Sequence, residues 1–87
     1  MKGNDNMYTY EIFNYSALCE NGKKIHVYLD IKITLNGRVV DRRHTFEGVA
    51  ACHPNDTFDF SKGVAVATLR AKQAISNYIF EKSLALY

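Results

Sequence analysis

Two cysteines and three histidines are the residues of this chain best suited to bind a metal ion or to act as nucleophile and base. Their spacing includes neither the CxxC nor the HxxxH pattern of metal sites. The sequence also lacks a P-loop and a GxGxxG motif. We assign no activating base to Cys19 or to Cys52, although His53 adjoins Cys52 in the sequence. The sequence therefore predicts no enzyme, no metal site and no cofactor, with both cysteines reduced in the cytosol.

Length and charge narrow the class of protein further. The 87 residues fit one domain, and 11 basic residues nearly balance 9 acidic ones. A domain of this size buries only about 60–65% of the surface that its unfolded chain exposes, so a partner or dimer would add needed stability. No apolar stretch reaches the ~18 residues of a membrane span. The polar start of the chain lacks the apolar run of a signal peptide, which predicts a cytoplasmic location.

The elements that must position any site can be read from one alternating run between two Asn-Gly pairs. Every odd residue from Ile25 to Leu35 is apolar, and polar residues or Tyr28 stand between them. This period of two is typical of a strand with one buried and one exposed face. Asn-Gly favours tight hairpin turns, because type I′ turns need positive φ at both central residues.

The chain is therefore predicted to be α+β, a three-stranded antiparallel β-meander packed on one face by a single C-terminal helix. The strands are expected at about residues 8–19, 24–35 and 38–51, with the second one central. Cap residues precede a helix expected at about 62–81. Its apolar residues have helical spacing: Val64, Ala67, Ala71, Ala74, Ile75, Tyr78 and Ile79.

The end of this helix and its far side give two further expectations. Continuing past Glu81 would place Lys82 in the middle of the apolar face, so the helix is predicted to break near Glu81. A thinner apolar stripe of Val66, Leu69 and Phe80 lies on the far side of the helix, either as scattered surface residues or as a second interface.

Two-residue turns at both Asn-Gly pairs predict a register with complementary charges on the exposed face. The expected opposed pairs are Lys32 with Asp41, Asp30 with Arg43, His26 with Glu47 and Glu11 with Lys32. Opposed unlike charges each stabilise a sheet by about 0.2–1 kcal/mol.

The same register gathers aromatic and basic side chains on the exposed face of the sheet, with Tyr15 directly opposite Tyr28. The predicted partner-binding residues are Phe13, Tyr15, His26, Tyr28, Lys32 and Arg43. Tyrosine and arginine are enriched at protein interfaces, and aromatic rings flanked by cations also stack nucleic-acid bases. Acidic residues on this face would repel phosphates, which favours a protein partner or a homodimer over nucleic acid.

A second, smaller polar group is expected on the buried face. There the register places Asn14, Arg42 and His44 near the buried residues of the central strand. Either a β-bulge re-aims part of an edge strand, or the polar groups lie beyond the helix, or the three form a small polar pocket. They are the second-choice site.

The second half of the chain resembles small uncharacterised βββα proteins of actinobacteria and phages. The matching residues are Gly48, Ala50, Pro54, Asp56, Asp59, Gly63, Ala67, Arg70 and Ala71. The layout also resembles the double-stranded-RNA-binding-domain-like fold without its first helix. In RNA-binding relatives a lysine cluster opens the final helix, whereas here Gly63 and Val66 follow Lys62, which argues against double-stranded RNA.

Two functions follow from these observations. The resemblance implies a non-enzymatic interaction module, such as a phage-type accessory factor that binds and modulates or inhibits a host protein in the host cytoplasm. The alternative is a nucleic-acid-binding module that uses the aromatic and basic face of the sheet.

Overall fold

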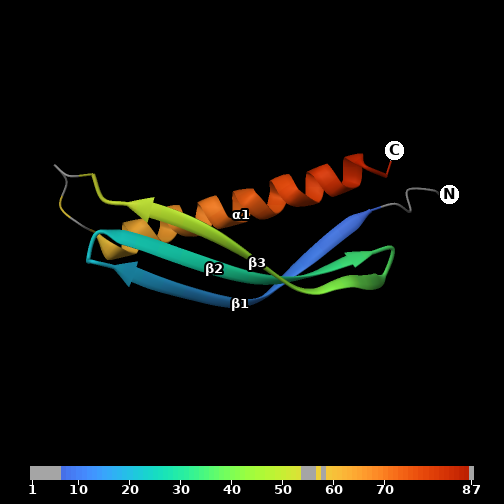
Figure 1. Ribbon diagram of the computed structural model, residues 1–87, viewed down its shortest axis with the longest axis horizontal. Coiled ribbons are helices and arrows are strands. Elements are labelled where there is room, and N and C mark those ends of the chain that lie inside the picture. The colour runs from blue at the N-terminus through green and yellow to red at the C-terminus, as the bar shows by residue number, and fades with distance from the viewer. Residues whose placement is uncertain (1–6, 54–56, 58, 87) are drawn as a thin grey trace.

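The computed structural model describes residues 7–53, Thr57 and residues 59–86. Strands β1 (Tyr8–Glu20), β2 (Lys24–Leu35) and β3 (Arg38–Ala51) form an antiparallel sheet in the order β1-β2-β3, and helix α1 (Phe60–Leu84) packs against one face (Figure 1). The predicted α+β meander with a central second strand is confirmed. We call the face toward α1 the helix side and the opposite face the outer face.

The core lies between β2 and α1. Its buried residues are Ile25, Val27, Leu29, Ile31 and Ile33 of β2, Ala50 of β3, and Ala67, Ala71 and Ile75 of α1. The alternation in β2 thus buries one side of the strand along its whole length, as the period of two requires. The small alanines of α1 allow a close approach to β3, where a Cβ atom built on Gly48 would lie 1.9 Å from the carbonyl oxygen of Ala67.

The helix starts at a side-chain cap and ends beyond its predicted break. The carboxylate of Asp59 accepts a hydrogen bond from the backbone N–H of Lys62 at 3.0 Å. At the other end α1 continues to Leu84, so the break predicted near Glu81 is wrong. The Lys82 ammonium lies 5.5 Å from the ring centre of Tyr8 and 5.4 Å from that of Tyr78. These two rings stabilise the charge that was expected to end the helix.

The first turn is longer than predicted. Residues 21–23 join β1 to β2, and the N–H of Lys23 donates to the carbonyl of Glu20 at 3.1 Å. Asn21 and Gly22 both have positive φ, at 55° and 65°. The extra residue shifts the pairing by one, so that Cys19 lies opposite Ile25.

A β-bulge at Phe13 shifts this pairing back. Glu11 pairs with Lys32 as predicted, but beyond the bulge Asn14 pairs with Asp30 and Tyr15 with Leu29. A shift of one residue moves side chains to the opposite face of the sheet. The predicted placement of Tyr15 opposite Tyr28 is therefore wrong.

The second hairpin starts in the predicted register and then changes. Leu35 pairs with Arg38 across Asn36 and Gly37, but two irregularities in β3 shift the pairing by two residues. The three predicted pairs that join β2 to β3 are therefore not directly opposed. Where the shift reaches two residues the faces are preserved, so Arg43 still meets Asp30 and Glu47 still meets His26 across the outer face. The predicted contact of Lys32 with Asp41 is wrong, because Asp41 pairs with Ile33 and binds His44.

Candidate interaction surface

On the outer face, a carboxylate of the central strand is held by three side chains. Asp30 accepts hydrogen bonds from the Thr45 hydroxyl, from the Asn14 amide at 3.0 Å and from the Arg43 guanidinium at 2.8 Å. Its side chain is only 9% exposed. These bonds, that of Thr45 most of all, lower the pKa of Asp30 to about 2. The cluster joins all three strands and is best explained as part of the fold.

A histidine lies between two carboxylates at the other end of the outer face. His26 Nδ1 lies 2.7 Å from Glu47, and Nε2 lies 2.7 Å from Glu20. A protonated imidazole donates to both carboxylates, whereas a neutral ring can donate to only one. The hydrogen bonds with Glu47 and then Glu20 accordingly raise the pKa of His26 above 6.5. This group also joins β1, β2 and β3.

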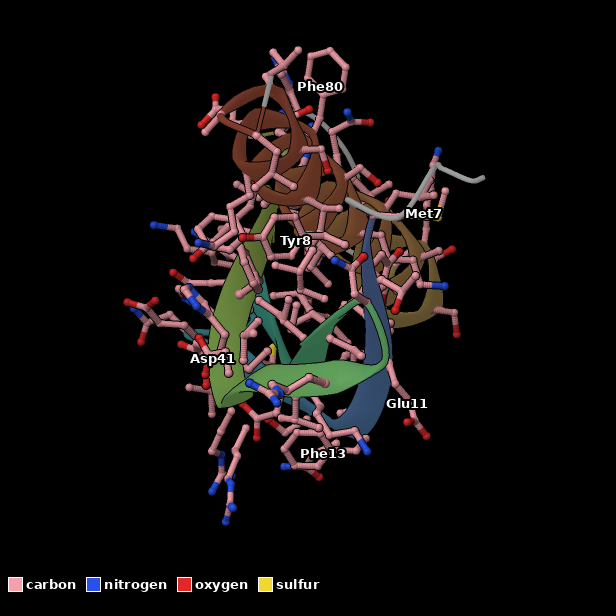
Figure 2. The ribbon with its side chains drawn as sticks, turned by 90° about the vertical axis from the view of Figure 1, so that its right-hand side faces the viewer. Met7, Tyr8, Glu11, Phe13, Asp41 and Phe80 are labelled. Carbon is pink, nitrogen blue, oxygen red and sulfur yellow. The ribbon has the colours of Figure 1, made fainter. Side chains whose placement is uncertain are left out.

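Five of the six predicted partner-binding residues lie on the outer face, namely Phe13, His26, Tyr28, Lys32 and Arg43. The Arg43 guanidinium lies 5.9 Å from the ring centre of Phe13, and the Lys32 ammonium lies 3.5 Å from the Glu11 carboxylate. Phe13 and Glu11 both project away from α1 (Figure 2). Arg43 and Lys32 are thus paired within the sheet, and Tyr15 does not join them because it lies on the helix side.

The three residues of the second-choice site are not brought together. Asn14 lies on the outer face beside Asp30, and Arg42 is exposed on β3. His44 lies on the helix side, where its ring stacks on Phe46 at 4.6 Å and approaches Tyr78 at 4.7 Å. The predicted polar pocket is therefore wrong. Bulges in the edge strands explain the polar residues instead.

Sequence reasoning missed the exposure of β1. Helix α1 lies over β2 and β3 and contacts β1 only sparsely, so β1 supplies no residue of the buried core. An α-helix is about 10 Å wide and strands are about 4.8 Å apart, so one helix covers only two strands. Large apolar side chains of β1 are left exposed: Tyr10 (40%), Ile12 (36%), Phe13 (51%), Tyr15 (49%) and Leu18 (56%).

The two edges of the sheet also differ in charge. Edge strand β3 carries Arg38, Asp41, Arg42, Arg43 and Glu47. Edge strand β1 carries no charge and no proline from Ile12 to Cys19. Natural sheets protect exposed edges with charges, prolines or bulges, because unpaired backbone groups recruit other strands. β1 has only its bulge at Phe13, so its edge is the more open of the two.

A pocket of about 420 Å³ lies at the start of α1, beside the end of β3. Its charged lining residues include Asp59, Lys62 and Arg70. Asp59 caps the helix, and the Arg70 guanidinium donates to the carbonyl of Val49 at 2.8 Å. Since the Asp59 carboxylate and the Arg70 guanidinium serve the fold, we assign no ligand to the pocket.

Comparisons with known proteins add no functional assignment. The sequence matches no protein-family model, and searches of curated proteins and of solved structures found no similar protein. Within residues 7–53, 57 and 59–86, no three His, Cys, Asp or Glu side chains gather so as to hold a metal ion. In the same described part of the chain, no helix is long and apolar enough to cross a membrane. The surface must therefore be interpreted from its own geometry.

Proposed function

We propose that this chain is a non-enzymatic protein-interaction module whose binding element is β1. The observation that carries the proposal is the position of α1, which covers β2 and β3 and leaves β1 exposed. The helix side of β1 then presents Tyr10, Ile12 and Tyr15 as one apolar row beside the helix. Exposed apolar patches with tyrosine at their centre are typical of protein interfaces.

The resemblance to small phage and actinobacterial proteins supports a narrower form of this proposal. In that form the partner is a host protein, and binding modulates or inhibits it in the host cytoplasm. The apolar row on β1 is the surface through which the chain would hold that protein.

Binding of nucleic acid through the outer face is less well supported. The Arg43 and Lys32 side chains are already paired with Asp30 and Glu11. Phosphate binding would have to compete with these carboxylates.

The test compares the wild type with one variant on each edge strand as bait in host lysate, with mass spectrometry of the retained proteins. Tyr10→Lys places a charge in the apolar row, and Val40→Lys places the same charge at an exposed site of β3. We expect proteins that are retained by the wild type and by Val40→Lys but lost with Tyr10→Lys. Equal retention by all three baits would overturn the proposal.

A mobility-shift assay with RNA and DNA tests the alternative. Binding to phosphates weakens steeply with added salt, because counterions are released. A salt-dependent shift that Lys32→Gln and Arg43→Gln weaken would favour the nucleic-acid function.

A further inference from the structure

The free edge of β1 is self-complementary over its regular stretch. Beyond the bulge, residues 14–20 pair with β2 without interruption, and Ala17 is the middle residue of the seven. Two such strands can pair antiparallel about a two-fold axis normal to the sheet. This axis keeps each side chain on its own face, so residues that share a face stand opposite each other.

Pairing centred on Ala17 opposes no like charges. It places Tyr15 opposite Cys19 on the helix side, and Ser16 opposite Leu18 on the outer face. Asn14 then lies opposite Glu20. The second N–H of the amide can donate to the Glu20 oxygen that does not contact His26, so the bonds to Asp30 and His26 are kept. The small side chain of Ala17 lies at the axis, where two copies of the same residue meet.

We propose that a second copy of this chain occupies the edge of β1, so that two sheets join into one sheet of six strands. This inference rests on the proposed function, and it adds a second copy of the chain as a partner of the same strand. A second copy fits this edge best, because the uncharged run of β1 offers no charge to select a charged peptide, whereas it matches itself in register.

The position of α1 leaves room for this dimer. Both helices would lie on the same side of the joined sheet, each over its own β2 and β3. Their axes would be four strand spacings apart, or about 19 Å. Packed helices lie about 8–10 Å apart, so the two helices would not clash. Between them the apolar rows of both β1 strands would line one trough, which leaves the proposed partner surface open in the dimer.

Light scattering and sedimentation of the full chain test the inference. We expect the wild type and Val40→Lys to have twice the 9.9 kDa mass of one chain, and Ala17→Lys to have the mass of one. The circular dichroism spectra of the three should agree, because Ala17 is exposed in the single chain.

Disulfide cross-linking tests the register without relying on a charged variant. In a Cys19→Ser, Cys52→Ser background, Ala17→Cys brings two thiols together at the axis, whereas Leu18→Cys leaves them on diagonal positions. A disulfide requires Cα atoms about 4.4–6.8 Å apart, so air oxidation should link Ala17→Cys at least about tenfold faster.

The outcomes separate this inference from the proposed function. A monomeric wild type at its highest soluble concentration, or equal cross-linking of Ala17→Cys and Leu18→Cys, would overturn the dimer. A monomer that still loses its partner through Tyr10→Lys would overturn the dimer alone. Tyr10→Lys that stays dimeric but retains the same proteins as the wild type would overturn the partner surface alone.

Discussion

Long polar side chains on the outer face reach their predicted partners although the strand pairing differs from the predicted register. Arg43 still binds Asp30 although Thr45 is the residue directly opposite. His26 reaches Glu47 in the same diagonal way. Charge complementarity in the sequence therefore predicted two true contacts through a pairing scheme that was wrong in detail.

The position of His26 between two carboxylates makes the stability of the protein depend on pH. Because the pKa of His26 is raised above 6.5 in the folded chain, its stabilisation is complete below 6.5 and is lost as the pH rises through the folded value. The pKa of Glu47 is lowered, so this carboxylate stays charged across that window. We expect the free energy of unfolding of the wild type to fall above pH 6.5, and that of His26→Gln to fall less. Urea denaturation at a series of pH values from about 5.5 to 9 measures the free energy of unfolding of both proteins.

An NMR titration of the His26 ring gives a direct control for this prediction. We expect the ring to titrate above 6.5, the ordinary value for histidine. A ring that titrates at or below that value would contradict the hydrogen bonds of His26 with Glu20 and Glu47. Glu20→Gln and Glu47→Gln should each lower the pKa of His26, because each removes one of the two carboxylates.

At the scale of elements, β2 could be predicted from sequence and the faces of β1 could not. Burial of one face requires the period of two seen from Ile25 to Leu35, which leaves little freedom. Asn21 and Gly22 supply positive φ to turns of two or three residues alike, so the length of the first turn could not be read. That one residue places Tyr15 on the helix side and Asn14 on the outer face. The polar site expected around Asn14 therefore does not form.

The buried residues of β2 give the first prediction at this scale. Leu29→Ala and Ile31→Ala should each lower the free energy of unfolding by about 2–5 kcal/mol, because both side chains are buried and would leave cavities. Chemical denaturation measures the loss. Val40→Ala, at an exposed site of β3, is the control and should change stability by less than about 0.5 kcal/mol. Losses below about 1 kcal/mol at both buried sites would be inconsistent with this core.

The close approach of α1 to β3 gives the second prediction at the scale of elements. In Gly48→Ala the new Cβ would meet backbone atoms of Ala67 and Ala71 at 1.9 and 2.5 Å, so the helix must move. We expect a loss of about 1–3 kcal/mol or more. In Gly63→Ala the nearest atom belongs to the Ile25 side chain, at 2.9 Å. Alanine also gains about 1 kcal/mol over glycine within a helix, so this matched variant should lose less. Equal losses in thermal unfolding would argue against the backbone contact.

The whole molecule is elongated and thinly packed for its length. Its radius of gyration is 16.0 Å, whereas a compact chain of 87 residues would have about 12 Å. The sequence could predict small size and a need for added buried area. It could not show where that area was missing, because the lateral position of α1 over the sheet depends on packing at Gly48 and the alanines of the helix.

This shape predicts a thermal stability that depends on protein concentration. If two copies pair through β1, only the folded chain associates, so each tenfold rise in concentration adds about 1.4 kcal/mol per dimer. We expect the unfolding midpoint of the wild type to rise by several degrees for each tenfold step. Ala17→Lys should unfold at one temperature at all concentrations and below the concentrated wild type, while Val40→Lys should follow the wild type. A wild-type midpoint independent of concentration would mean that the open strand adds no stability by pairing with itself.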